Sequence, residues 1–479
     1  MGGALDGEVF IGIDLGTSAL KGVAISGNGS VLASARASYP TRRVEPGRAE
    51  QDPADWISAF RNVTRQLAGV VPGASWSGIG LSGMIPTLVT VDDRGQANGP
   101  AITWEDARAE PEGEELRGAT ENLSARTGQW VDGRYLLPMF RWIERHDPDR
   151  AASAAAVLGA KDFLFAWLTG ERATDPSTAT GFGCYDLHEG AWIDGLAPDV
   201  ALPEIRKSSF ASELLGDRSD ELRIPRGMRV TLGAADSVCA ALGIGVTEPG
   251  ECAYIWGTST PVLGVAREPQ ADPTHRYLVT PLATGKMFGR EMDLLSTGAA
   301  LAWAAALFDV DGPSEVLGLA EASPPGANGV TFLPYLAFGE QGTLWNPNLR
   351  GTIDGLTIAH TRQDVARALV EAIAVESRRA VEVLAASDVD AREVRVTGAV
   401  ATEPFFLQQL ANAMERRVVP VDSPSAAAAG AASLAAGRTI TAPEGTPVEP
   451  DAETSPFWEE RRNGSDELRE KVQPRGLGR

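Results

Sequence analysis

The sequence contains little cysteine and little histidine, and it has fewer positively than negatively charged residues. Its 479 residues include four histidines and three cysteines, Cys184, Cys239 and Cys252, and neither set has the spacing of a metal site. We therefore expect reduced cysteines in a cytoplasmic protein, with no disulfide framework. The formal net charge of -21 repels the phosphate backbone of nucleic acids, which argues against a nucleic-acid partner.

Long hydrophobic runs are also missing. No run approaches the roughly 20 apolar residues of a transmembrane helix, so we expect no membrane partner. The first ten residues have neither a basic region nor an apolar core, and we expect no secretory signal. Hydrophobic residues nevertheless make up 43% of the chain, enough for large buried cores. At about 100–200 residues per domain, the length indicates two or three domains.

A strand–loop–strand unit occurs twice. Residues 9–13 are typical of a buried strand, the turn Gly16-Thr17-Ser18 follows, and residues 20–25 and 31–37 continue as an antiparallel meander. A second apolar strand meets Gly257-Thr258-Ser259 and continues as a strand about half a chain later. The repeated context indicates an internal duplication.

The rest of the chain mixes helices and strands in an α/β pattern. Turn residues at 243–251 place a domain boundary there, giving domains at 1–246 and 247–438. Residues 439–479 are rich in Pro, Glu and Arg, and we expect a weakly structured tail. Apolar spacing predicts strands over 77–83, 87–93, 394–397 and 417–421, and helices over 55–67, 136–145, 161–168, 237–242, 299–308, 362–386, 405–416 and 426–436.

The two Gly-Thr-Ser loops suit phosphate binding. Small side chains let backbone N–H groups approach phosphate oxygens, and threonine hydroxyls add donors. Asp14, just before the first loop, is placed to act through magnesium and its bound water. Taken singly, either loop could be an ordinary hairpin turn. Other phosphate motifs fail, because no Gly-x-x-x-x-Gly-Lys-Ser/Thr occurs and the Gly-x-Gly-x-x-Gly match at 78–83 opens no helix before Pro86.

Two further carboxylates are candidates for a group that binds the hydroxyl accepting a phosphate or removes its proton. Asp236 follows small residues at the start of a predicted helix, where it is either an N-cap or a base directed into a cleft. Asp106 lies beside Trp104, a pairing that suits hydroxyl binding against an apolar wall, although a solvated acidic loop explains it equally well.

These residues resemble the FGGY carbohydrate kinases, which include xylulokinase, gluconokinase and glycerol kinase. The resemblance runs in order over roughly residues 9–437. Its motifs comprise Asp14-Leu15-Gly16-Thr17-Ser18, Glu50-Gln51-Asp52-Pro53 with Trp56, Ser82-Gly83, Trp104-Glu105-Asp106-Ala107-Arg108, Lys161-Asp162, Leu168-Thr169-Gly170-Glu171, Thr174-Asp175, Asp236, Gly257-Thr258-Ser259, Leu333-Pro334-Tyr335, Gly339-Glu340, Pro347-Asn348, Arg350-Gly351 and Thr397-Gly398.

The resemblance implies two actin-like, ribonuclease H-like ATPase domains that close on a cleft, with ATP and Mg²⁺ as cofactors. Asp236 would be the catalytic base, and Asp14 and Asp236 would lie at the metal. A homodimer or another homo-oligomer is also implied. The nucleotide would contact Asp14, Gly16, Thr17, Ser18, Lys21, Gly257, Thr258, Ser259, Gly298, Gly398 and Ala399. The sugar would contact Met84, Ile85, Trp104, Glu105, Asp106, Asp236 and Ser237.

The sequence departs from the family pattern where specificity is determined. Residues 84–87 lack the Gln and His of the xylulokinase pattern, Glu105 replaces an Asn, and Ser237 follows the base. Xylulose is therefore the nearest named substrate, with gluconate or another polyol as the alternative, and the added Glu105 argues against an acidic sugar. Val400 stands in a glycine-rich adenosine motif, where we expect it to crowd the adenine. This change leaves a catalytically impaired regulatory homologue as an alternative, while an actin-class chaperone would leave the sugar motifs unexplained.

Overall fold

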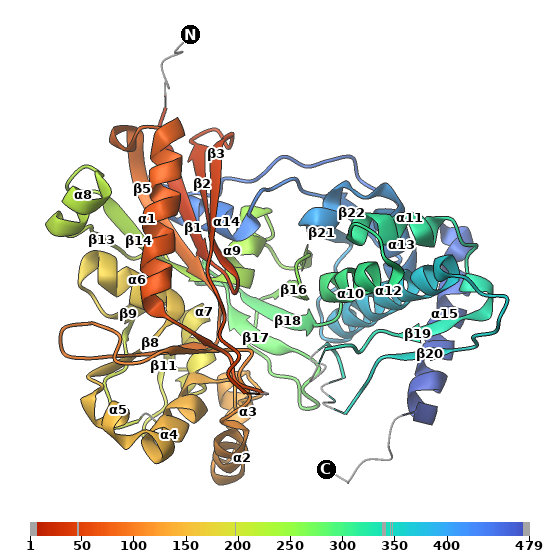
Figure 1. Ribbon diagram of the computed structural model, residues 1–479, viewed down its shortest axis with the longest axis horizontal. Helices are drawn as coiled ribbons and strands as arrows, with labels where there is room; N and C mark the ends of the chain where they lie inside the picture. The colour runs from red at the N-terminus through yellow and green to blue at the C-terminus, as the bar shows by residue number, and fades with distance from the viewer. Residues whose placement is uncertain are drawn as a thin grey trace.

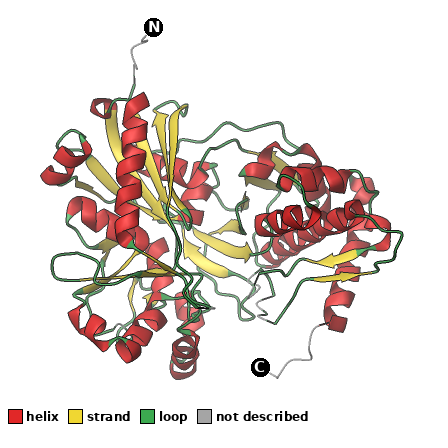
Figure 2. Cartoon of the chain, in the orientation of Figure 1, coloured by secondary structure: helices red, strands yellow, loops and turns green. Residues whose placement is uncertain are grey.

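The protein consists of two α/β halves that lie side by side (Figure 1). The computed structural model describes residues 7–45, 47–196, 198–337, 342–344, 346 and 348–472. Figure 2 shows strands running through the interior of the N-terminal half, while helices dominate the visible face of the C-terminal half. Within the described residues, no helix combines the length and the apolar character needed to cross a membrane.

The N-terminal sheet is an antiparallel meander extended by two parallel strands. β1 pairs antiparallel with β2 and parallel with β5, and β14 joins β5 in parallel. All residues of β1 are buried, because helices cover both faces of the sheet. In spatial order the strands are β13 (Ala211–Glu213), β14 (Arg229–Ala235), β5 (Trp76–Gly83), β1 (Val9–Leu15), β2 (Ala19–Ser26) and β3 (Val31–Ser38).

Helices from opposite ends of the chain cover this sheet. α1 (Pro53–Val70) begins where the Asp52 carboxylate accepts a hydrogen bond from the Ala54 N–H, and it packs on β2 and β3. α14 (Ala426–Ala436) lies on the opposite face against β1 and β5. A Cβ atom on Gly12 would lie 1.7 Å from the Ala428 carbonyl oxygen, so only glycine permits this approach.

α14 also crosses α9 (Asp236–Gly243) in backbone contact. A Cβ atom on Gly430 would lie 1.8 Å from the Cys239 carbonyl oxygen, and one on Gly243 would lie 2.1 Å from that of Ala426. Small, buried residues fill both helices, as the sequence predicts for 237–242 and 426–436. The crossing joins α9, the first helix after the N-terminal sheet, to α14 of the C-terminal half.

A lower lobe completes the N-terminal half. Its four-stranded sheet consists of β4 (Glu50–Gln51), β7 (Ala101–Thr103), β6 (Thr87–Val91) and β8 (Ala156–Gly159). Short paired strands are β9 (Ala173–Thr174), β10 (Tyr185–Asp186), β11 (Ala191–Trp192) and β12 (Glu204–Ile205). The helices of the N-terminal half, besides those already given, are α2 (Glu110–Ala119), α3 (Leu123–Thr127), α4 (Leu136–His146), α5 (Pro148–Ser153), α6 (Ala160–Thr169), α7 (Pro176–Ala179) and α8 (Gly216–Leu222).

The C-terminal sheet repeats the strand order of the first. An antiparallel meander is again followed by two parallel strands, with the second Gly-Thr-Ser turn between β15 and β16. This match is what a duplicated strand–Gly-Thr-Ser–strand unit predicts. The strands in order are β17 (Leu278–Pro281), β18 (Phe288–Leu294), β16 (Thr260–Ala266), β15 (Glu251–Ile255), β21 (Glu393–Thr397) and β22 (Arg417–Pro420).

Helices enclose the C-terminal sheet and bury a large apolar core. α12, a long helix, starts at a capping box between Thr361 and Asp364. The remaining elements of this half are α10 (Gly298–Phe308), α11 (Pro313–Glu321), α12 (Arg362–Ala386), α13 (Pro404–Met414), β19 (Thr331–Leu333) and β20 (Thr352–Asp354).

The prediction of a weakly structured tail is wrong for residues 439–472. Val448 and Glu444 form bridges to the end of the C-terminal sheet, and α15 (Ser455–Val472) packs on α12 and α13. The helix has few apolar residues, so its composition looks disordered, but Trp458 is buried. Arg461 forms an ion pair at 2.9 Å with Glu371 of α12, which compensates the burial of this carboxylate. Residues 473–479 of the predicted tail lie outside the described residues.

We predict that Trp458→Ala lowers the free energy of unfolding by about 3–5 kcal/mol, because a buried indole leaves a large void. Denaturant unfolding followed by circular dichroism measures this change. Trp303→Ala is the matched control, since the Trp303 side chain is 40% exposed. An equal effect of the two substitutions would contradict the packing of α15 described above.

Candidate active site

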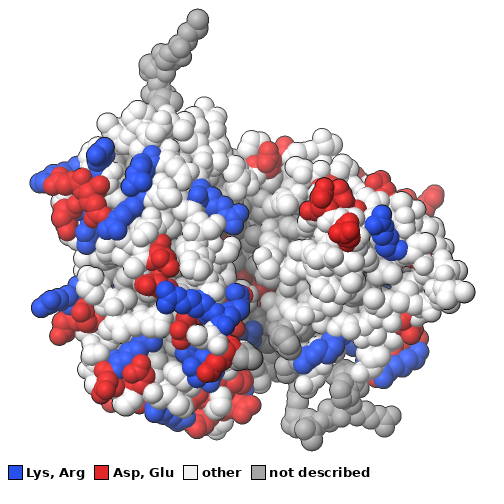
Figure 3. Space-filling view, in the orientation of Figure 1, with Lys and Arg blue, Asp and Glu red and all other residues white. Residues whose placement is uncertain are grey.

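A cavity of about 710 Å³ lies between the two sheets. Both Gly-Thr-Ser loops line it, together with the start of α9 and residues 423–427, which lead into and begin α14. The space-filling view in Figure 3 shows the boundary between the halves as a furrow, with charged residues of both signs interspersed over the N-terminal half. The pairing of β1 with β5 and of β15 with β21 brings residues distant in the sequence to this cavity.

The first loop, residues 16–18, is held from three sides. The Tyr39 hydroxyl donates a hydrogen bond to the Gly16 carbonyl. The Gln51 side chain donates to the Thr17 carbonyl at 2.7 Å, and the Trp104 indole donates to the Thr17 hydroxyl at 3.0 Å. The loop is therefore fixed by residues from two of the motifs that the sequence singled out.

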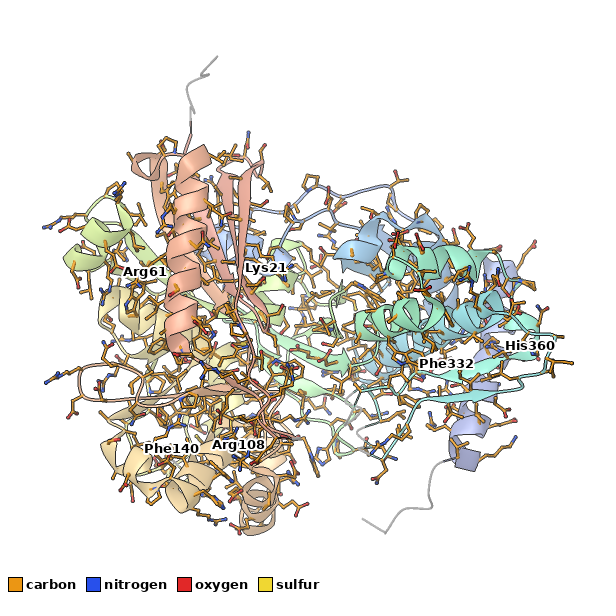
Figure 4. All side chains as sticks on the ribbon, in the orientation of Figure 1. Lys21, Arg61, Arg108, Phe140, Phe332 and His360 are labelled. Carbon is orange, nitrogen blue, oxygen red and sulfur yellow. The ribbon has the colours of Figure 1, made fainter. Side chains whose placement is uncertain are left out.

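Asp14, the penultimate residue of β1, lies at the wall of the cavity. Its side chain is buried, and its Oδ1 atom accepts no hydrogen bond among the described residues. Burial raises the pKa of Asp14, against the opposing charge of Lys21, whose Nζ lies 3.9 Å from Oδ2. Lys21 also lines the cavity, and Figure 4 labels it on β2.

The second loop, residues 257–259, is supported by two glycines. A Cβ atom on Gly298 would lie 2.1 Å from the Gly257 carbonyl oxygen. One on Gly398 would lie 2.2 Å from the Trp256 carbonyl oxygen, and Gly398 has a φ of +96°, so a side chain is excluded twice. Gly398 lines the cavity, whereas Gly298 is not among the described lining residues and packs behind the loop.

Asp236 lines the cavity from the first residue of α9. It is not an N-cap, because Ala235 occupies that position, and the Asp236 carboxylate instead accepts a hydrogen bond from the Ser237 N–H at 2.9 Å. Burial, together with the nearby carboxylates of Asp14 and Glu291 as smaller causes, raises the pKa of Asp236 to about 8. The sequence allowed Asp236 to be either an N-cap or a carboxylate directed into a cleft, and the geometry fits the second.

The predicted sugar residues fall into two groups. Ile85, Trp104, Glu105 and Ser237 line the cavity. The Glu105 carboxylate accepts two hydrogen bonds of 2.9 Å from Arg43, so its charge is compensated.

Met84 and Asp106 are absent from the described lining. Met84 packs in the core of the N-terminal sheet. The Asp106 carboxylate is fully buried, where it binds the Arg108 guanidinium at 2.7 Å and accepts a hydrogen bond of 2.6 Å from the Ala49 N–H. Its place is thus inside the lower lobe, beside the labelled Arg108 of Figure 4, and not at the cavity surface.

The expected crowding of the cavity by Val400 is wrong. Its side chain is buried in the core of the C-terminal half, and it is not among the described lining residues. Ala399 is exposed at the start of the 3₁₀ turn, also outside the lining. Gly398 alone makes the close approach to the Trp256 carbonyl, so the next two residues, Ala399 and Val400, have room for side chains. The motif residues Gly339, Glu340 and Pro347 lie outside the described residues.

Two carboxylates of the cavity were missed from the sequence. Glu291 and Asp293 of β18 line it and alternate with the buried Met292 and Leu294. Burial raises the pKa of Glu291 to about 7, and that of Asp293 to about 6. Strand alternation in residues 288–294 was a usable signal, because it places both acids on one face. The remaining lining residues from the lower lobe include Gln129, Arg134, Tyr135, Thr180 and Gly181.

The arrangement fits a magnesium ion that is held mainly by water and phosphate. Within the described residues, no three His, Cys, Asp or Glu side chains form a metal cluster. Mg²⁺ in nucleotide sites commonly uses one or two protein carboxylates and takes its other ligands from phosphates and water. The buried, unpartnered Oδ1 of Asp14 is suited to this role, either directly or through a metal-bound water.

Comparison with known proteins identifies the family of the chain. The chain matches the FGGY family of carbohydrate kinases, with the N-terminal domain over residues 9–243 and the C-terminal domain over residues 252–438. The xylulose kinase of Bacillus subtilis is 28% identical over 446 residues, which cover 90% of this chain and 88% of that protein. The gluconokinase of the same organism is 28% identical over 451 residues, with 89% and 86% covered.

Among solved structures, the xylulose kinase from Rhodospirillum rubrum has a TM-score of 0.88 and 28% identity, with 98% of this chain and 99% of that chain covered. The gluconate kinase from Lactobacillus acidophilus has a TM-score of 0.90 at 24% identity, a likeness of fold. The two-domain fold is thus the actin-like ATPase fold of these kinases. Since the two domain matches together span most of the sequence, the chain belongs to the FGGY family of carbohydrate kinases, phosphotransferases with an alcohol group as acceptor.

Proposed function

We propose that this kinase transfers the γ-phosphate of ATP to a hydroxyl group of a neutral ketopentose such as xylulose, with Asp236 as the catalytic base. The observation that carries the proposal is the convergence of both Gly-Thr-Ser loops, Asp14 and Asp236 on one cavity. Phosphoryl transfer depends on donors around the phosphates, on charge neutralisation and on a group that positions the acceptor hydroxyl.

The two loops are the proposed phosphate cradle. Gly16, Thr17 and Ser18 approach from the N-terminal half together with Lys21, and Gly257, Thr258 and Ser259 approach from the C-terminal half. Their backbone N–H groups and hydroxyls are donors, and Lys21 adds a positive charge. Gly398 leaves room for the rest of the nucleotide beside the second loop, with Gly298 supporting that loop from behind.

Asp14 and Asp236 are the proposed protein partners of Mg²⁺. The ion, when bound with the phosphates, supplies positive charge that neutralises phosphate oxygens and lowers the pKa of nearby carboxylates. Asp236 then accepts the proton of the acceptor hydroxyl on the carboxylate oxygen that the Ser237 N–H does not occupy. Exclusion of water between the two halves prevents hydrolysis of ATP from competing.

The charges at the acceptor side favour a neutral sugar. Glu105 is compensated by Arg43, so it does not repel an acidic sugar as the sequence suggested. Glu291 has no such ion pair among the described interactions, and its carboxylate accepts a hydrogen bond of 3.3 Å from the Thr280 hydroxyl beside Asp236 and Ser237. A substrate carboxylate beside Glu291 and Asp236 would raise the pKa of both groups still further, because like charges in one site disfavour ionisation, whereas hydroxyl groups impose no such cost.

The regulatory alternative loses its main support. It rested on a distorted adenosine motif, but Val400 faces the core and Gly398 keeps its close approach to Trp256. A homodimer or another homo-oligomer, and a cytoplasmic location, stay predictions. The three cysteines are buried and unpaired within the described residues, which supports a reducing compartment.

We predict that Asp236→Asn lowers kcat by about 10²- to 10⁴-fold, as for loss of a catalytic base. A coupled assay of ADP release with xylulose measures this loss. The raised pKa means that folded Asp236 keeps a proton that the unfolded chain has released between about pH 4 and 8, so the free energy of unfolding falls as pH rises through that window. The variant should therefore melt at or above the wild-type temperature at pH 8. Retained activity would contradict the assigned base.

We predict that gluconate is a poorer substrate than xylulose, and that Glu291→Gln raises kcat/KM for gluconate by about tenfold through loss of a like charge. The same variant should leave kcat/KM for xylulose nearly unchanged, which makes the neutral sugar the internal control. The assay is ADP release with both acceptors, followed by NMR of the product. Efficient use of gluconate by the wild type would overturn the neutral-sugar assignment, and no turnover of any acceptor would restore the regulatory alternative.

We predict that Val400→Ala lowers the free energy of unfolding by about 1–3 kcal/mol, because it removes buried methyl groups. The Michaelis constant for ATP should not change, since the side chain faces the core. Denaturant unfolding and ATP titration of the initial rate measure the two quantities. A lower Michaelis constant for ATP in the variant would show that Val400 reaches the nucleotide.

A further inference from the structure

A buried ionic cluster lies directly behind the acceptor side of the cavity. The Lys161 ammonium group is fully buried, 2.8 Å from Asp162 Oδ1 and 3.2 Å from Asp175 Oδ1. Buried charges persist only when partners and hydrogen bonds compensate their loss of hydration. None of the three residues is among the described lining residues, so direct contact with a substrate does not explain the cluster.

The Asp175 carboxylate is held by several donors. Its Oδ1 atom accepts a hydrogen bond of 2.7 Å from the Thr178 hydroxyl, besides the contact with Lys161. Its Oδ2 atom accepts hydrogen bonds from the Ser177 N–H at 3.1 Å, the Ser177 hydroxyl at 2.5 Å and the Ser208 hydroxyl at 3.1 Å. The carboxylate is therefore fixed in position, and so is the hydroxyl of Ser177.

Ser177 connects this cluster to the start of α9. Its hydroxyl donates to Asp175 and accepts a hydrogen bond of 2.9 Å from the backbone N–H of Ala235. Ala235 is the last residue of β14 and directly precedes Asp236. Since a helix start has unpaired backbone N–H groups and Ala235 has no capping side chain, this bond fixes where the chain turns from strand to helix.

The same cluster supports two further segments of the cavity wall. The Thr180 hydroxyl, in the lining, donates to the Ser177 carbonyl at 2.7 Å. A Cβ atom on Gly83 would lie 3.0 Å from the Lys161 Cβ, so the strand that leads to Ile85 packs closely on the lysine stem. One buried cluster thus backs the walls that carry Asp236, Thr180 and Ile85.

We propose that Ser177, held by Asp175, is a positioning residue that fixes the Asp236 carboxylate for proton acceptance. This inference rests on the proposed role of Asp236 as the base. Ser177 does not touch the acceptor, and it acts through the Ala235 backbone. A shift of the base by a fraction of a hydrogen-bond length affects the rate far more than it affects the affinity.

The test is Ser177→Ala, which removes the acceptor of the Ala235 N–H and leaves the lining side chains in place. We expect kcat with xylulose to fall by about 10- to 100-fold, while the Michaelis constants for xylulose and ATP stay near those of the wild type. Ser208→Ala is the matched control. It removes a hydroxyl from the same Asp175 Oδ2 atom but has no bond to Ala235, and kcat should stay near the wild-type value.

The outcomes distinguish the positioning role of Ser177 from the role of Asp236 as the base. An unchanged kcat in Ser177→Ala, or an equal loss in Ser177→Ala and Ser208→Ala, would show that the cluster only stabilises the fold. If Ser177→Ala fails to fold, Ser177→Cys keeps the shape with a weaker donor and acceptor and should give an intermediate kcat. Asp236→Asn is assayed in parallel with the acceptor that the wild type turns over. If this variant stays active, the base assignment fails, whereas an inactive Asp236→Asn beside a fully active Ser177→Ala overturns the positioning role alone.

Discussion

The contact of α14 with β1, β5 and α9, backbone against backbone, is the constraint on which the rest of the structure depends. Gly12 and Gly80 let the helix meet the first sheet, and Gly243 and Gly430 let it cross α9. A single added methyl group at these positions would collide with a carbonyl oxygen at 2.1 Å or less. Through this contact the cavity residues 423–427 and Asp236 are placed next to the loop at the end of β1.

The cavity combines this rigid frame with unfavourable electrostatics. Asp14, Asp236, Glu291 and Asp293 face a common space, and burial raises the pKa of each. Such a group of acids is costly without a cation, so a protein that only needed to be stable would have no reason to build it. The buried Lys161–Asp175 cluster shows the opposite solution, in which each carboxylate meets a matched donor. The contrast between a group of like charges and a cluster that Lys161 compensates separates the proposed reacting site from the residues behind it.

Local patterns predicted much of the fold. The meander, the repeated Gly-Thr-Ser turns and the helices over 53–70, 362–386 and 426–436 follow from apolar periodicity and small-residue turns that hold regardless of tertiary context. The chemistry-bearing loops were found because glycine and hydroxyl residues adjoin strand ends. Glu291 and Asp293 were missed because β18 reaches the cavity only through its pairing with β16.

The errors have a shared physical origin. Asp106 directly follows a cavity residue and Val400 lies two positions after one, but neither side chain faces the cavity. α15 was missed because few apolar residues mark its buried face, and part of its packing on α12 uses ion pairs such as Arg461 with Glu371. Direction of a side chain and distant ion pairs depend on the assembled fold, and composition does not contain them.

The origin of α14 near the end of the chain has a consequence for biosynthesis. The ribosome has made every strand of the first sheet by residue 235, yet one face of β1 and β5 stays bare until residues 426–436 emerge. The first sheet therefore cannot complete its packing earlier, and its apolar surface stays open to aggregation while some 190 further residues are synthesised. Completion of the first domain waits for nearly the last helix of the second.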